Sequence, residues 1–161
     1  MKKLISAVLA ATSLATTSAA AEPHFAAYPT KIYLKGKSVL PKMTGSVANF
    51  RTRITNSMKA GPNFGGHFTL IEIGCGSSCI FAFLIDARDG RVVDFPLGGE
   101  ENYQLQMNYG IDSTLLQAEW MDTSVGDYDT CVRAYYDVGS GNLTKVSSET
   151  YKIERFSFCS Q

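Results

Sequence analysis

The sequence lacks an excess of charge of either sign. Its 161 residues contain 15 lysine and arginine residues against 15 aspartate and glutamate residues, and the basic residues form no block or stripe. Proteins that bind nucleic acid non-specifically obtain their affinity from clustered cations that neutralise phosphates. We therefore expect no nucleic acid among the partners.

Long apolar runs are also lacking, apart from one near the amino end. That run covers Leu4–Leu14, follows Met1-Lys2-Lys3 and leads into small residues that end at Ala19-Ala20-Ala21. It is too short to span a bilayer, which needs about 20 apolar residues. A positive start, an apolar middle and an A-x-A end are the three parts of a secretory signal peptide. We predict a signal peptide at residues 1–21 and one globular domain at residues 22–161, periplasmic or secreted, with no membrane insertion after cleavage.

Histidine is scarce, and the loop at Gly74–Cys79 contains no Gly-x-Ser-x-Gly motif, which exposes the nucleophile of many serine hydrolases. A nucleophilic Cys–His pair or a metal site would have to combine His67 with Cys75 or Cys79. His67 and Cys75 are eight positions apart, about 26 Å along a straight strand, and export favours oxidised cysteines. We therefore predict no metal site and no cofactor.

Four cysteines are present, and all lie in the predicted mature domain: Cys75, Cys79, Cys131 and Cys159. An even number of cysteines in an exported chain predicts disulfides. We favour the pairs Cys75–Cys79 and Cys131–Cys159, the first of which requires a tight turn over Gly76-Ser77-Ser78. Chain-entropy arithmetic gives the long loop roughly 3.5 kcal/mol of stabilisation and the short one roughly 2. The crossed pairing, Cys75–Cys131 with Cys79–Cys159, is the alternative.

One amphipathic helix is predicted where Val47, Phe50, Ile54 and Met58 recur at spacings of three and four. Thr44 or Ser46 is the candidate N-cap, and Gly61-Pro62 ends the helix. Extended segments are expected at 31–34, 67–73, 79–86, 91–95, 103–109, 114–120, 128–138, 143–146 and 151–158. The almost wholly apolar segment 79–86 is expected to be a central strand covered on both faces.

The connections between these segments are short and contain no crossover helices, so the strands should pair mainly in antiparallel fashion. The Asp-Gly signal in Ala87-Arg88-Asp89-Gly90 predicts a hairpin turn. The predicted fold is an α+β domain in which one amphipathic helix packs on a mostly antiparallel sheet of about seven strands, with two disulfides.

Two glycine-containing motifs are separated by one predicted strand. They are Asn63-Phe64-Gly65-Gly66-His67-Phe68 and Gly74-Cys75-Gly76-Ser77-Ser78-Cys79. Three further segments follow in order: Ile85-Asp86-Ala87 before Gly90, Asp112-Ser113-Thr114-Leu115-Leu116, and Tyr135-Tyr136 before Gly139-Ser140-Gly141. In order and spacing the chain resembles a family of uncharacterised exported bacterial proteins over roughly residues 45–147, with Phe68 where that family has Tyr. The resemblance implies export and brings no activity with it.

The two motifs supply the candidate functional residues. An antiparallel return from Cys79 should place Cys79 near Ile73 and Asp86 near His67. The latter pair fits an acid–base pair or a structural histidine bound to a carboxylate, and we favour the structural role. A disulfide-pinched loop on a rigid sheet suits recognition, because cross-linking reduces the ordering entropy lost on binding.

We therefore expect a binding or inhibitor-like module that recognises an unidentified protein or envelope ligand. Its candidate binding residues are Asn63, His67, Gly76, Ser77 and Ser78. The alternative is a small envelope hydrolase in which His67 is the general base, oriented by Asp86.

Overall fold

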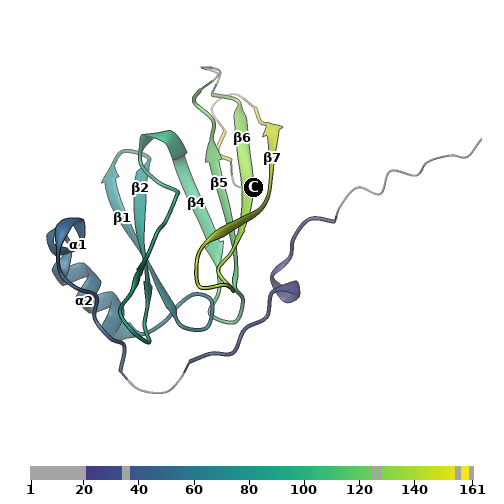
Figure 1. Cartoon of the computed structure of the whole chain (residues 1–161). Helices are drawn as coiled ribbons and strands as arrows, with labels where there is room; N and C mark the ends of the chain where they lie inside the picture. Colours follow the sequence, from purple (N-terminus) through teal and green to yellow (C-terminus); the bar gives the residue numbers. More distant parts are fainter. Residues whose placement is uncertain (1–20, 34–36, 125, 127, 155–156, 160–161) are drawn as a thin grey trace, which may run out of the picture.

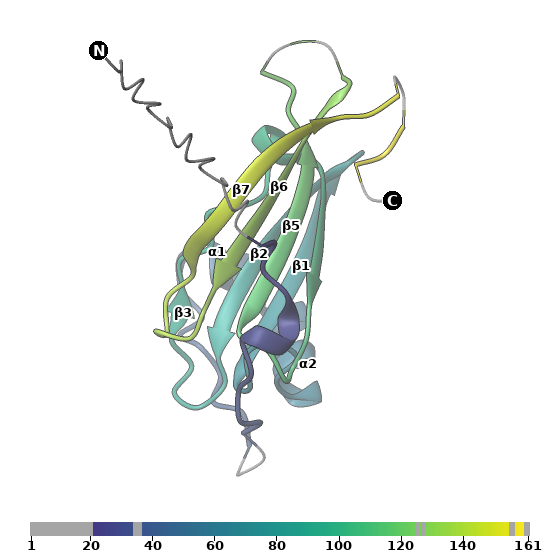
Figure 2. The same cartoon turned by 90° about the vertical axis from the view of Figure 1, so that its right-hand side faces the viewer.

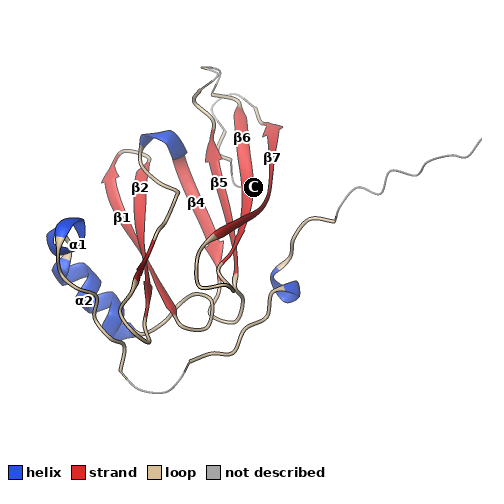
Figure 3. Cartoon of the chain, viewed as in Figure 1, coloured by secondary structure: helices blue, strands red, loops and turns tan. Residues whose placement is uncertain are grey.

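The computed structural model describes residues 21–33, 37–124, 126, 128–154 and 157–159 (Figure 1). The predicted signal peptide lies outside the described residues, except for Ala21. Within the described ranges, no helix is long and apolar enough to cross a membrane. Strands make up most of the regular structure, with the two α-helices grouped on one side (Figure 3).

The predicted helix is present but is divided in two, α1 (Gly45–Asn49) and α2 (Arg51–Ala60). Phe50 lies at the break with φ −113° and ψ 21°, and its ring packs edge-on against Phe81 at 5.3 Å. Thr44 occupies the N-cap position of α1, although its side chain makes no capping hydrogen bond. Gly61 ends α2 with φ +97°, a conformation that glycine adopts at little cost.

The first sheet contains β1 (Phe68–Gly76), β2 (Cys79–Asp86) and β3 (Val92–Val93), in that order and antiparallel. Its alternating side chains enter two different cores, as expected for a strand with a period of two. Leu70 and Leu84 face the second sheet, whereas Ile71 and Ile85 pack against the helices. The prediction that the segment 79–86 is a central strand covered on both faces is confirmed.

The second sheet contains β4 (Tyr103–Tyr109), β5 (Leu115–Met121), β6 (Thr130–Asp137) and β7 (Thr144–Lys152), antiparallel and in that order. The molecule therefore has three layers: helices, first sheet and second sheet (Figure 1). The Tyr109 hydroxyl donates to Glu72 Oε1 at 3.0 Å and links the two sheets. Burial and the nearby Glu72 carboxylate raise the pKa of Tyr109 to about 12.

Two short 3-10 helices complete the regular structure, η1 (Phe25–Ala27) and η2 (Glu100–Asn102). The segment containing η1, drawn purple, runs in front of the second sheet (Figure 2). It is attached there by backbone contacts, including Thr114 N to Tyr28 O at 2.9 Å and the bridge between Pro29 and Ser113. This segment brings residues 21–29 onto the outer face of the second sheet.

Three segment predictions were wrong. The described part of the expected strand at 31–34 is not a strand, although Tyr33 N donates a hydrogen bond to Gly66 O at 2.7 Å. Leu34 lies outside the described residues. The return strand expected at 91–95 is only Val92–Val93. The strand expected at 143–146 continues to Lys152 as β7, whose exposed middle is too polar to show an apolar alternation. Of the strand expected at 151–158, only Tyr151 and Lys152 are strand; residues 155 and 156 lie outside the described residues.

The α+β class, the antiparallel pairing and the seven strands are confirmed, although the strands form two sheets. The favoured disulfide pairing is also confirmed. Cys75–Cys79 and Cys131–Cys159 are both formed, with Cα–Cα distances of 5.1 and 5.5 Å. The crossed pairing is therefore wrong.

Candidate functional site

The β1–β2 hairpin ends in a small ring closed by the Cys75–Cys79 disulfide. Cys79 pairs with Gly76, so the expectation that it would lie opposite Ile73 was wrong; Ile73 pairs with Phe81. The turn is tighter than expected because Gly76 and Ser78 both have positive φ, +144° and +59°. The Gly76-Ser77-Ser78 tip is therefore a locked turn at the end of a paired hairpin.

The loop before β4 and the first residues of β4 lie directly against this tip. Gln104 N donates to Ser78 O at 2.9 Å, and Gly99 N donates to Ile80 O at 2.8 Å. A Cβ atom at Gly98 would lie 2.7 Å from Phe81 Cα, so only glycine allows this approach. The tip is thereby held by hydrogen bonds to the chain beside it as well as by its own disulfide.

A concave site, which we call the tip cavity, opens beside the disulfide. It has a volume of about 420 Å³. Its lining residues come from the hairpin, from η2 and β4, and from the loop after β5: Cys75, Gly76, Ser77, Cys79, Glu100, Tyr103, Thr123 and Tyr128. The rings of Tyr103 and Tyr128 meet edge to face at 6.4 Å. Tyr128 is 49% exposed, which leaves its ring accessible to a partner.

Backbone strain is concentrated around the same cavity. Among the described residues, the non-glycine positions with positive φ are Ser78, Gln104 and Tyr128, at +59°, +58° and +47°. A residue with a Cβ pays roughly 1–2 kcal/mol for the left-handed conformation. Gln104 Oε1 is in addition buried without a hydrogen-bond partner. Strain that persists in a fold marks candidate functional positions, so this clustering singles out the tip cavity.

His67 and Asp86 do lie together, as the sequence predicted. His67 Nε2 is 3.6 Å from Asp86 Oδ2, which is too long for a hydrogen bond. Asp86 is 1% exposed and is bound instead by Arg88. Its Oδ1 accepts from Arg88 N and Nε, both at 3.0 Å, and its Oδ2 accepts from Arg88 Nη2 at 2.7 Å. The carboxylate is thus oriented by Arg88 rather than orienting the imidazole.

Electrostatics at this pair favour a neutral histidine and an ionised aspartate. Desolvation lowers the pKa of His67, and the opposing attraction of Asp86 does not offset it. Burial raises the pKa of Asp86, but the hydrogen bonds from Arg88 outweigh that effect and leave it lowered. His67 Nε2 is buried with no hydrogen-bond partner among the described residues, and the ring packs on Phe68 at 4.1 Å.

The predicted binding residues do not form one site. Gly76 and Ser77 line the tip cavity, and Ser78 supports it through its contact with Gln104. Asn63 and His67 lie at the other end of the hairpin, where β1 begins. The Asn63 side chain exchanges two hydrogen bonds with the backbone of Leu70, at 2.9 and 2.7 Å, so it replaces a missing strand partner.

Sequence reasoning missed Glu100, Tyr103, Thr123 and Tyr128, which complete the cavity from distant segments. It also missed the buried carboxylate of Glu119 on the outer face of the second sheet. Positive φ at three non-glycine positions leaves no signal in the sequence, and a glutamate within a strand suggests a solvent-facing position. Within the described ranges, no group of three or more His, Cys, Asp or Glu side chains is arranged to hold a metal ion.

Comparisons with protein-family models, with curated proteins and with solved structures find no match for this chain.

Proposed function

We propose that this protein is an exported binding module whose tip cavity receives a basic side chain of a protein partner. The observation that carries the proposal is the cavity itself: two tyrosine rings and the carboxylate of Glu100 line it, and none of its described lining residues is a lysine or arginine. Aromatic faces and a carboxylate together favour a cationic group. A volume of about 420 Å³ suits one long side chain with its neighbours.

The rigidity of the tip supports a binding role. The disulfide, the Gln104–Ser78 hydrogen bond and the close approach at Gly98 fix the cavity before any partner arrives. A preorganised site loses less entropy on binding. Small exported inhibitors of envelope hydrolases have this general build, and an inhibitor-like action on such an enzyme is the form of binding that we favour.

Export is part of the proposal. We propose a cleaved signal peptide at residues 1–21 and a periplasmic or secreted mature domain. Two formed disulfides are typical of an oxidising compartment. The resemblance to exported bacterial proteins, which rests on the motifs around His67 and Cys75, points in the same direction.

The hydrolase alternative, with His67 as general base, has less support. A base needs an orienting partner and access to substrate. Arg88 occupies both carboxylate oxygens of Asp86, and His67 is not among the residues that line the tip cavity. The buried Nε2 has no orienting hydrogen bond.

Site-specific photo-crosslinking in the exporting cell tests the binding proposal. A photoreactive residue replaces Tyr128, which is 49% exposed at the tip, and in a matched control it replaces Val92, which is 42% exposed on β3 at the far end of the hairpin. We expect an adduct of defined mass from position 128 and none from position 92. That adduct should weaken when Glu100→Gln is added or when excess Nα-acetyl-lysine amide competes. Equal adducts from both positions, or an adduct indifferent to Glu100, would refute the proposal.

A further inference from the structure

On the outer face of the second sheet, a single guanidinium contacts three carboxylates. Arg133 Nε donates to Glu119 Oε1, and Arg133 Nη1 lies 3.3 Å from Glu22 Oε1 and 3.2 Å from Glu149 Oε1. We call these four residues the Arg133 network. Its members come from the amino-terminal segment, β5, β6 and β7, which are far apart in the sequence.

Hydrogen bonds satisfy much of this network but do not balance its charge. Glu119, with an 8% exposed side chain, also accepts from Gln117 Nε2 at 2.9 Å and from the Tyr151 hydroxyl at 3.2 Å. The Tyr135 hydroxyl donates to Glu22 Oε1. These donors are neutral, so within the Arg133 network itself three negative charges share one positive charge. Glu119 is buried, whereas the Glu22 and Glu149 side chains are 56% and 57% exposed. The net negative charge should attract a further cation to the site.

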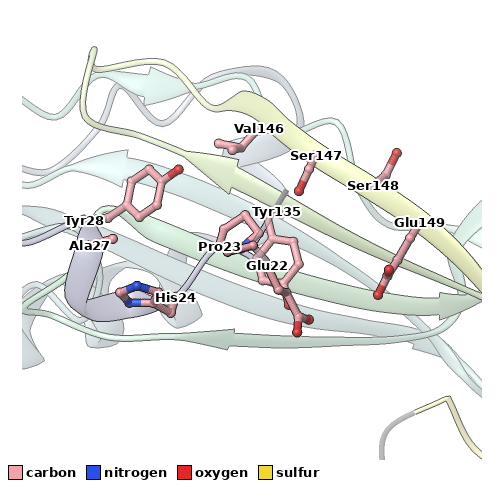
Figure 4. A pocket seen from close by; sticks show the side chains of 11 residues that line it. Glu22, Pro23, His24, Ala27, Tyr28, Tyr135, Val146, Ser147, Ser148 and Glu149 are labelled. Carbon is pink, nitrogen blue, oxygen red and sulfur yellow. The ribbon is translucent and has the colours of Figure 1, made fainter. Parts of the chain in front are cut away.

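A cavity of about 510 Å³ lies beside the network, between the amino-terminal segment and β7 (Figure 4). Glu22, Tyr135, Ser147 and Glu149 line it, together with other residues, and none of the described lining residues is a lysine or arginine. Figure 4 shows Glu22 and Pro23 beside the Tyr135 ring, with Glu149 on the neighbouring strand. The cavity therefore offers carboxylates and hydroxyls to a cation. Among its described lining residues, only His24 has a side chain that can carry a positive charge.

The position of Glu22 indicates where that cation comes from. Glu22 directly follows Ala21, the last residue of the predicted signal peptide. In the precursor, the Glu22 nitrogen is an uncharged amide. Pro23 restricts Glu22 to extended conformations, so the segment is already held in the shape that places its carboxylate at Arg133.

We propose that hydrolysis of the Ala21–Glu22 bond creates an α-ammonium group that binds in this cavity and completes the Arg133 network. Water adds across the peptide bond: Ala21 leaves as a carboxylate with the signal peptide, and the Glu22 nitrogen takes up a proton. The inference rests on the export part of the proposed function. It makes removal of the signal peptide a step that stabilises the mature fold, in addition to releasing it.

The proposal predicts a pH dependence whose sign is fixed. Charged and titratable groups around the ammonium group are Glu22, His24 and Tyr28 on its own segment, Glu119 on β5, Arg133 and Tyr135 on β6, and Glu149 and Tyr151 on β7. Three carboxylates against one guanidinium should raise the α-amino pKa above its ordinary 7.7–8.0. The added stability is then complete below about pH 8 and is lost as the pH rises through the raised value.

The neighbouring tyrosines should not obscure this transition. Burial and the Glu22 contact raise the pKa of Tyr135, and burial and Glu119 raise that of Tyr151, so both hydroxyls keep their protons while the amine titrates. His24 is present in every form compared, and its contribution therefore cancels.

The test begins with the full chain exported by a bacterial host and purified in the form that the cell makes. Its intact mass should correspond to residues 22–161 with both disulfides formed. The comparison form carries a Gly-Ser insertion between Ala21 and Glu22, so that the ammonium group lies two residues from the network. Urea unfolding of both is measured at pH 7 and pH 10, because uncharged urea does not screen the ion pairs. Acetylation of the α-amine is followed against pH by mass spectrometry.

We expect the α-amino pKa to be at least one unit higher in the form without the insertion. At pH 7 the unfolding equilibrium constant of the inserted form should accordingly be at least tenfold larger. The difference should shrink at pH 10 and in Glu149→Gln variants of both forms, since Glu149 is exposed and its loss should not unfold the domain. Equal amine pKa values, equal stabilities at pH 7, or an exported protein that starts at another residue would overturn the inference but leave the binding proposal intact. A chain that is not exported would contradict the proposed function as well.

Discussion

Replacing Arg88 with alanine tests whether Asp86 is held as a structural anion. Asp86 is 1% exposed, and the substitution removes the hydrogen bonds from Arg88 Nε and Nη2 while the one from Arg88 N remains. Loss of one partner of a buried ion pair costs about 3–5 kcal/mol. The Arg88 side chain is 49% exposed, so water would replace part of the lost solvation, and we expect a loss of about 2–3 kcal/mol.

The assay is urea unfolding at pH 7 with both disulfides intact, since guanidinium ion would screen the pair and could itself bind Asp86. Asp86→Asn should cost about 1.5–3 kcal/mol, because an amide group then faces Arg88 Nη2 in place of an oxygen. The double variant should lose less unfolding free energy than the two single variants together, because no unpaired charge is left when both partners are replaced. If Arg88→Ala stays within about 0.5 kcal/mol of the wild type, the pairing with Arg88 does not hold Asp86. Asp86 would then be free to orient His67.

Three further predictions concern other parts of the fold. Gly98→Ala should lose roughly 1–3 kcal/mol in urea unfolding, because its Cβ would overlap the Phe81 backbone, whereas the open position Gly74→Ala should change little. Replacing both Cys131 and Cys159 by serine should lower the unfolding free energy by roughly 3.5 kcal/mol, and reductant should then have only the smaller effect of the tip disulfide. Folding lowers the pKa of His67, so the wild type should lose stability as the pH falls below about 6.5, and His67→Gln should lose less between pH 7 and pH 5; equal losses would contradict the buried neutral histidine.

The sequence predicted the elements whose burial follows a simple period. The limits of Cys79–Asp86 and Tyr103–Tyr109 were correct because one is a continuous apolar run and the other alternates cleanly. β7 was divided wrongly because it is an edge strand whose exposed middle carries polar side chains on both faces. The division of the strands into two sheets depends on how the loop between β3 and β4 folds back, and a local pattern does not contain that information.

The candidate site was only partly predictable. The tip was found because two glycines and two cysteines within six positions require an unusual turn. Tyr103 and Tyr128 were not found as site residues because tertiary packing alone brings them to that turn. The proximity of Asp86 and His67 could be predicted from strand register. The hydrogen bonds from Arg88 to the same carboxylate depend on the side-chain conformation of a residue two positions away, which the register does not predict.

The connectivity of the two disulfides has a consequence for how the chain is oxidised. The first cysteine pairs with the second and the third with the fourth, so neither disulfide encloses or crosses the other. In a chain that crosses a membrane amino end first, Cys75 and Cys79 reach the oxidising side together, before the remaining cysteines. Pairing in order of arrival therefore yields the native bonds directly, and folding of this protein should not depend on an enzyme that reshuffles disulfides.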